Sequence, residues 1–308
     1  MTAPVTFSHR AEYYGLRGAA AALRQLGFRR AGNVGESIGR RIYDWVGIRR
    51  DVVERQIRAA FPGLAENEVM RVARESYGNL GRTAIETAVL PKCTPAEIVA
   101  LFDIIDNWAI VEETVARGMG VILVSGHLGN WELGASYIAA RGVHMEAVAR
   151  RMQNPLFDDY LTDTRRRVGV NVIHDSEAVR RVPRVVRNGG VVGFLFDQGA
   201  AGLASTWVPF FGRYAKTPRG PAVFALRLNA PIVFTCAVRE PTGRYSMKFE
   251  EVVVQRTGDL DRDIEAIVGE YTRVLERWVR RYPEQYFWHH RRWKHQRPGT
   301  PPQLGDPS

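Results

Sequence analysis

The chain has 308 residues, 45% of them hydrophobic and 25% charged, a composition that excludes a disordered or fibrous protein and allows a large buried core. Its formal net charge of +10 favours an anionic partner, either nucleic acid or a membrane with acidic lipids. Only Cys93 and Cys236 are present, which excludes a disulfide framework and a four-cysteine zinc site and fits a reducing compartment; we expect both to be buried structural residues.

The first 60 residues concentrate the positive charge, with eleven arginines and five acidic residues, a net charge of +6. Residues 10–28 fit a helix with two faces, an apolar one (Tyr13, Leu16, Ala20, Leu23) and a basic one (Arg10, Arg17, Arg24). This pattern predicts either an interfacial membrane helix or a surface helix packed on the domain. No run of eighteen apolar residues is present, so we expect neither a transmembrane helix nor a secretory signal, and any membrane attachment should be peripheral.

Residues 36–90 continue in a helical pattern, interrupted at Pro62-Gly63. The helical pattern consists of two apolar stripes. The first is formed by Ile38, Ile42, Trp45 and Val46 and the second by Val69, Val72, Tyr77 and Leu80. Residues 1–90 are therefore predicted to be a helical lead-in that covers a sheet or presents a membrane-facing surface.

Residues 91–298 alternate between strands and helices, which predicts an α/β core with a mostly parallel sheet flanked by helices. The strands are expected at residues 102–105, 121–124, 145–149 and 191–196, followed by a hairpin at 231–239 and 245–254 that adds antiparallel strands. A long helix with an apolar stripe from Ile264 to Trp278 should end near Pro283, and residues 299–308 should form a disordered tail.

The loop from Ser125 to Glu132 is the first of three candidate sites at strand ends, where ligands of α/β sheets gather. Asn130 is a suitable N-cap for a helix that begins at Trp131, and this turn can bring His127 toward Glu132. Such a pair forms a general base, because the carboxylate fixes one tautomer of the imidazole while the other nitrogen removes a proton from a hydroxyl. The alternatives are a structural histidine and an acid that only favours the helix dipole. Without a Gly-x-Ser-x-Gly nucleophile, a group would pass directly from donor to acceptor, and no further histidine or cysteine at ligand spacing predicts a metal.

The second loop, residues 149–156, contains Arg150 and Asn154, and the run Arg165, Arg166 and Arg167 closes the helix that follows. Arg150, Arg165 and Arg167 are candidates for binding phosphate, although at least one of the three terminal arginines is expected only to complement the helix dipole.

The third loop begins with Asp197-Gln198, where a buried acid needs a partner and could anchor one of those arginines. Residues 207–212 could line a path for an acyl chain or form a packed loop. Thr217-Pro218-Arg219 should open a helix, so that Lys216 and Arg219 flank an anion site. The aromatic and basic residues of 285–294 suit either a membrane-interface edge or a nucleic-acid surface.

These segments, taken in order, resemble the lauroyl/myristoyl (late) acyltransferases of lipid A biosynthesis, within the wider lysophospholipid acyltransferase group. The resemblance covers residues 10–298. It depends on residues 127–132, Arg150 with residues 154–158, Asp197-Gln198, residues 208–212 and residues 284–294.

The resemblance implies a glycerol-phosphate-acyltransferase-like fold and transfer of a fatty acyl group to a hydroxyl of a lipid A precursor. The donor would be acyl carrier protein or acyl-CoA, with no cofactor beyond the donor's phosphopantetheine, no metal and no nucleic acid. The reaction would take place at the cytoplasmic face of the bacterial inner membrane on an anionic glycolipid. His127 would be the base and Glu132 its partner, Arg150 and Asp197 match further important residues, and Asn130, Asn154, Arg165, Arg167, Gln198, Lys216 and Arg219 are expected to bind substrate or support the site.

Two further features bear on the acceptor. Many family members begin with a hydrophobic helix, whereas the arginine-striped segment here suggests peripheral attachment. A related branch acylates phosphatidylinositol mannosides, but there the acid is more often aspartate, which favours the lipid A branch. A lipid hydrolase or thioesterase that uses the same base with water is an alternative, and a basic nucleic-acid-binding protein is a distant one, since no groove-reading helix, zinc pattern or RNA-binding signature is present.

Overall fold

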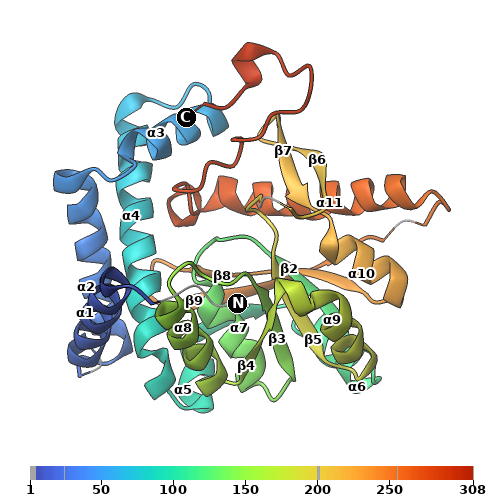
Figure 1. Cartoon of the computed structure of the whole chain (residues 1–308), viewed down its shortest axis with the longest axis horizontal. Coiled ribbons are helices and arrows are strands. Elements are labelled where there is room, and N and C mark those ends of the chain that lie inside the picture. Colours follow the sequence, from blue (N-terminus) through green and yellow to red (C-terminus); the bar gives the residue numbers. More distant parts are fainter. Residues whose placement is uncertain (1–4, 24, 200–201, 255, 308) are drawn as a thin grey trace.

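A seven-stranded sheet forms the centre of the molecule in the computed structural model, which describes residues 5–23, 25–199, 202–254 and 256–307 (Figure 1). Its strand order is β1-β9-β8-β2-β5-β3-β4. The strands are β1 (Phe102–Asp106), β2 (Val121–Ser125), β3 (Met145–Ala149), β4 (Val170–His174), β5 (Val191–Leu195), β8 (Ile232–Arg239) and β9 (Tyr245–Val252). β9 is antiparallel to β8 and parallel to β1, so this pair at one edge runs opposite to the other five strands. The predicted α/β class, with a mostly parallel sheet and antiparallel edge strands, is confirmed.

Both faces of the sheet are covered, as the apolar runs of the central strands require. Ile122 and Val124 of β2 pack in one core cluster with residues of α9 (Ala178–Arg187), α10 (Gly220–Leu228) and α11 (Leu260–Arg281). Their neighbours Val121 and Leu123 point to the opposite face and pack in a second cluster. The helices on that face include α5 (Pro95–Val99), α6 (Ala109–Ala116) and α7 (Trp131–Ala140).

Two strand regions were missed from the sequence. β4 is a strand at the sheet edge in which only Val170 and Ile173 are buried, so it shows neither a continuous apolar run nor a strict alternation. β6 (Ser205–Phe210) and β7 (Arg213–Pro218) form a separate antiparallel pair, so Val208 and Phe210 are buried strand residues and do not line an open path. The prediction that Thr217-Pro218-Arg219 opens a helix is wrong in register, because α10 begins only at Gly220 and Arg219 caps it without a side-chain hydrogen bond.

The N-terminal helices gather at one end of the sheet, on the left of Figure 1. They are α1 (Phe7–Leu23), α2 (Phe28–Arg41), the π-helix η1 (Ile42–Val46), α3 (Arg50–Ala60) and α4 (Glu66–Val89), which leads into the 3₁₀ turn η2 (Leu90–Lys92). None of the described helices combines the length and the apolar character needed to cross a membrane.

The helix α1 packs on α8 (Pro155–Arg167). The ring of Tyr13 meets that of Tyr160 at 6.4 Å, and the Asn154 amide donates to the carbonyl of His9 at 3.2 Å. Arg10 and Arg17 of the predicted basic face are exposed, whereas Arg24 and the side chains of Leu16 and Ala20 lie outside the described residues. The alternative of a surface helix packed on the domain therefore has direct contacts in its favour.

Glycines bring α2 into close contact with α4. A Cβ on Gly39 would lie 2.0 Å from the carbonyl oxygen of Tyr77, and one on Gly35 would lie 2.4 Å from that of Gly81, so only glycine fits at these crossings. The two helices therefore meet along their small residues, with backbone against backbone.

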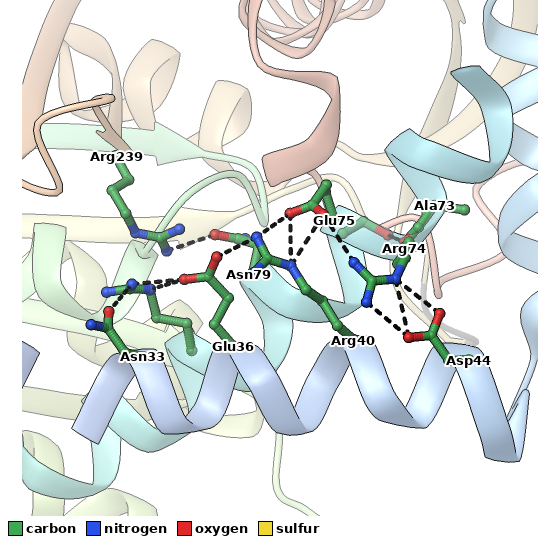
Figure 2. Close-up of polar contacts among 11 residues, drawn as sticks. Asn33, Glu36, Arg40, Asp44, Ala73, Arg74, Glu75, Asn79 and Arg239 are labelled. Atoms are coloured by element: carbon green, nitrogen blue, oxygen red, sulfur yellow. Dashed lines mark hydrogen bonds and ion pairs between the residues drawn. The ribbon is translucent and has the colours of Figure 1, made fainter. Parts of the chain in front are cut away.

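Ion pairs flank this glycine contact (Figure 2). Arg40 bridges Glu36 and Glu75, and Arg74 binds Asp44 with two nitrogens. Because α2 is fixed by its glycine face, most of the predicted stripe does not cover the sheet: Ile38, Trp45 and Val46 are 43%, 81% and 63% exposed, whereas Ile42 is partly buried against the core.

The C-terminal part follows the sequence prediction up to the end of α11 at Arg281, just before η4 (Pro283–Gln285). The tail expected to be disordered has a 3₁₀ turn, η5 (Pro302–Leu304), and the Arg213 guanidinium donates to the Gly305 carbonyl at 2.9 Å. Cys236 is buried as expected, but Cys93 is only partly buried.

Candidate active site

The loop that follows β2 is held by backbone contacts on both sides. Gly129 has a φ of +66°, and a Cβ there would lie 1.9 Å from the Ala237 carbonyl oxygen, so the position requires glycine. Its N–H donates to the Gln285 carbonyl at 3.0 Å, and the Asn130 N–H donates to the Ala237 carbonyl at 2.8 Å. The loop is thus pinned between β8 and the segment after α11.

Asn130 caps α7 as predicted, since its Oδ1 accepts from the Leu133 N–H at 2.9 Å. Its Nδ2 donates to Glu86 of α4 at 2.8 Å, and the hydroxyl of Tyr245 donates to the same Glu86 carboxylate, which is 1% exposed. A buried carboxylate therefore fixes the start of α7, a role that nothing in the sequence pattern of α4 indicates.

Strand register brings His127 to Asp197. Ser125 of β2 pairs with Leu195 of β5, so the residues two positions beyond each strand end meet across the parallel pair. The imidazole Nδ1 lies 2.7 Å from Oδ1 of Asp197, and the backbone N–H of His127 donates to Oδ2 at 2.9 Å. With Nδ1–H donating to the carboxylate, Nε2 remains available to accept a proton.

Asp197 is fully ionised at neutral pH. Burial would raise the pKa of its carboxyl, but the His127 ring, the His127 N–H and the charge of Arg292 outweigh burial and lower the pKa to about 2. The predicted partner of the imidazole, Glu132, is therefore not the residue that hydrogen-bonds it. The expectation that Asp197 anchors one of the arginines of the second loop is also wrong.

Glu132 binds Arg165 instead. The Arg165 guanidinium reaches both carboxylate oxygens, with Nε 2.9 Å from Oε2, and both side chains are largely buried. Burial acts to raise the pKa of Glu132, whereas the charge and hydrogen bonds of Arg165 lower it below the usual value. Arg165 is thus a structural counter-ion and not a free phosphate ligand.

A cavity of about 910 Å³ opens beside His127 and the Glu132–Arg165 ion pair. His127, Glu132, Arg150, Arg165, Gln198 and Arg219 line it among many apolar side chains, which include Leu123, Ile138, Met145, Phe194, Met247 and Leu260. A cavity that is mostly apolar, with a few polar groups at one place, suits a long apolar ligand with a reactive polar end.

The remaining predicted residues take other roles. Asn154 caps α8 through its Oδ1, which accepts from the Leu156 N–H at 3.1 Å. Arg167 is exposed and pairs with Asp163, and Lys216 offers its carbonyl to Arg292 at 2.9 Å; neither is among the residues that line the cavity. Arg219 does line it but also pairs with Asp261.

The C-terminal segment 285–294 contributes buried residues that the sequence analysis missed. Trp288 and Trp293 are 1% and 0% exposed, so this segment is neither a membrane edge nor a nucleic-acid surface. Buried Arg292 donates to the Thr217 hydroxyl at 2.6 Å and adds positive charge near Asp197. Asp197 in turn helps to raise the pKa of Tyr286 well above its usual value, after burial. The sequence shows only that aromatic and basic residues are interleaved in this segment, and that pattern does not distinguish buried residues that support the site from residues of an exposed surface.

Two aromatic rings hold the imidazole in place. The ring of Trp131 lies 4.8 Å from that of His127 and the ring of Phe287 lies 5.8 Å from it.

Among the described residues, no three histidine, cysteine, aspartate or glutamate side chains gather as a metal site would need.

Comparison with known families matches residues 6–295 to the bacterial lipid A biosynthesis acyltransferases. The chain belongs to this family. As a family member it is an acyltransferase.

Curated relatives agree with this assignment. The chain is 26% identical over 254 residues to a lipid A biosynthesis lauroyltransferase of Escherichia coli K12, which covers 82% of this chain and 81% of the relative. It is 24% identical to the palmitoleoyltransferase of the same organism over 85% of this chain and 84% of the relative. It is also 26% identical to a phosphatidylinositol mannoside acyltransferase of Mycobacterium tuberculosis, over 56% of this chain and 55% of the relative. Acyl transfer to a lipid is common to all three names.

Proposed function

We propose that the protein transfers a fatty acyl group from the thioester of acyl carrier protein to a hydroxyl of a lipid A precursor, with His127 as the general base. The observation that carries this proposal is the 2.7 Å contact between His127 Nδ1 and the ionised Asp197, beside a large apolar cavity. The carboxylate holds the imidazole in the tautomer whose Nε2 can accept a proton, and it stabilises the imidazolium that forms.

The reaction proceeds in two steps. Nε2 takes the proton of the acceptor hydroxyl as its oxygen attacks the thioester carbonyl, which gives a tetrahedral intermediate. The intermediate then collapses, the carbon–sulfur bond breaks, and the imidazolium returns the proton to the leaving thiolate. The acyl chain is never bound covalently to the protein. Glu132 acts by holding Arg165 at the cavity wall, a change from the role that its spacing suggested.

A carrier protein as donor is supported by the basic surface of α9. Arg180, Arg184 and Arg187 are exposed on this helix, and Val179, which is 79% exposed, also lines the cavity. Acidic carrier proteins are steered to such surfaces by charge. A donor of this kind places the reaction at the cytoplasmic side of the membrane; acyl-CoA is the alternative donor.

An anionic glycolipid acceptor is supported by Arg150 and Arg219, whose side chains line the same cavity as His127. Three E. coli relatives named for lipid A, each matched over 73% or more of its length, favour a lipid A precursor. A phosphatidylinositol mannoside is the second candidate, because a relative named for that acceptor matches over about half of the chain.

A transfer assay with radiolabelled acyl carrier protein tests the proposal, with the lipid A precursor and a phosphatidylinositol mannoside offered in separate reactions. We expect acylated lipid A precursor from the wild type and a loss of about 10²- to 10⁴-fold for His127→Ala. Free fatty acid as the product would instead indicate a hydrolase. Transfer only to the phosphatidylinositol mannoside would show that this lipid, and not the lipid A precursor, is the acceptor. Undiminished transfer by His127→Ala would remove this residue from the mechanism.

A further inference from the structure

The turn between α2 and α3 exposes apolar side chains at a protruding point of the helical end of the molecule (Figure 1). Trp45, Val46 and Ile48 are 81%, 63% and 60% exposed. The turn consists of the π-helix η1 and the residues that follow it, of which Gly47 and Arg49 have positive φ values of 67° and 60°. A monomeric protein in water gains nothing from exposing a tryptophan together with two aliphatic side chains, so this turn is suited to bind a membrane or a protein partner.

The turn is held rigidly in this position. The helix α2 that precedes it is fixed to α4 by the backbone contacts of Gly35 and Gly39 and by the ion pairs of Figure 2. One of those pairs joins Asp44, in the turn itself, to Arg74 of α4. The apolar side chains therefore cannot fold back onto the domain without breaking this contact.

Positive charge surrounds the apolar residues. Arg41 and Arg49 are exposed, and among the residues that the structure describes no carboxylate forms an ion pair with either. The acidic residues nearby are Asp44, which Arg74 neutralises, Glu54, which pairs with Arg50 and Arg58, and the exposed Asp51. Tryptophan flanked by arginine is the combination that lipid headgroup regions favour, and the arginines select anionic lipids.

A short chain of contacts leads from the turn to His127. The hydroxyl of Tyr77 donates to the Ile48 carbonyl, and the Tyr77 ring lies 4.2 Å from that of His289. His289 stacks on Phe287 at 5.2 Å, and Phe287 lies 5.8 Å from the His127 ring. Three side chains, Tyr77, His289 and Phe287, thus link the turn to the imidazole through packed contacts.

We propose that Trp45, Val46 and Ile48, with Arg41 and Arg49, form an anchor that inserts into an anionic lipid bilayer and sets the distance between the bilayer and His127. This anchor turn rests on the proposed function, because it presents the site to an acceptor that resides in the membrane. A bilayer fits better than a protein partner, since a convex turn of three apolar residues offers no groove and too little area for a stable protein interface. The anchor differs from α1, whose Tyr13 is already packed against α8.

Vesicle flotation tests the anchor turn, with vesicles of phosphatidylethanolamine and phosphatidylglycerol in equal parts. We expect Trp45→Ser, Val46→Ser and Ile48→Ser, combined in one variant, to raise the apparent dissociation constant by about 10- to 100-fold. The matched control replaces Met119, Val253 and Leu304, three exposed apolar residues elsewhere, with serine and should bind as the wild type does. Equal binding by the anchor variant and the wild type would overturn the proposal.

Two further measurements separate this proposal from the proposed function. With the acceptor dispersed in detergent, the anchor variant should transfer acyl groups as fast as the wild type, whereas with the acceptor in vesicles it should be slower. If the wild type acylates neither preparation, the proposed function fails while the flotation result stands by itself. Arg41→Gln with Arg49→Asn should abolish the preference for phosphatidylglycerol over phosphatidylcholine vesicles; a preference that persists would contradict the role of these arginines.

Discussion

Asp197 just after the end of β5 and Glu132 at the start of α7 are two buried carboxylates near His127, and each binds a different basic side chain. Asp197 binds an imidazole, whose second nitrogen can accept a proton, whereas Glu132 binds a guanidinium that stays charged. The first pair can therefore take part in proton transfer, and the second can only be structural or electrostatic. Glu132 was predicted to bind His127 because the two residues are close in the sequence. The residue that binds the imidazole is Asp197, because β2 and β5 are neighbouring strands.

The largest effect is expected from Asp197→Asn. The amide cannot stabilise the imidazolium and favours the wrong tautomer, so we expect the turnover number to fall by about 10³-fold with the fold retained. Turnover is measured with the acceptor in detergent and the fold by circular dichroism. A variant with wild-type turnover would show that Asp197 does not act through His127.

Glu132→Gln should affect stability more than chemistry. It leaves Arg165 buried and unpaired, so we expect the free energy of unfolding to fall by about 3 kcal/mol in a denaturant titration. The double variant Glu132→Gln with Arg165→Met should regain most of this loss, because the buried charge is gone. If the double variant is no more stable than the single one, the ion pair is not what Glu132 contributes.

Acid should remove the contribution of Asp197 to the stability of the fold. The pKa of Asp197 is lowered in the folded protein from 3.8 to about 2, so its contribution to stability is fully present above about pH 4 and is lost as the pH falls toward 2. The shift corresponds to about 2 kcal/mol. The difference in unfolding free energy between the wild type and Asp197→Asn should shrink over this range in urea titrations. A difference that stays constant with pH would contradict the lowered pKa.

The smallest effect concerns the basic surface of α9, where the acyl carrier protein is proposed to bind. Arg180→Glu with Arg184→Glu should raise the KM for the carrier-protein thioester by about 10-fold at low salt and leave the turnover number unchanged. The matched control reverses Arg117 and Arg262, which are exposed elsewhere on the surface. Equal KM values for both variants would remove α9 from donor binding.

Much of the fold could be predicted because the signals are local. The central apolar runs, the Asn130 cap and the end of α11 near Pro283 all follow from residues close together in the sequence. β4 was missed because Asn171 and His174 interrupt its apolar residues, and the β6–β7 pair because β6 contains Pro209 and β7 contains Arg213 and Lys216. An apolar stripe over residues 38–46 was predicted, but Ile38, Trp45 and Val46 are exposed because α2 packs on α4 through its glycines instead.

The site was predicted in its members but not in its pairings. His127, Arg150 and Asp197 all belong to strand ends, and a parallel sheet brings such ends together. Which carboxylate meets the imidazole depends on the order of β2 and β5 and on their register, which no local pattern gives. Arg292 and Glu86 were missed for the same reason, since each reaches the loop from an element distant in the sequence.

The central claim is that Asp197, and not Glu132, holds His127 as the base, and nitrogen NMR of the labelled imidazole tests it most directly. In the wild type at a pH where the ring is neutral, we expect His127 to carry its proton on Nδ1 with Nε2 unprotonated. Glu132→Gln should keep this tautomer, and Asp197→Asn should lose it. The account is contradicted if Asp197→Asn keeps the Nδ1–H tautomer while Glu132→Gln loses it.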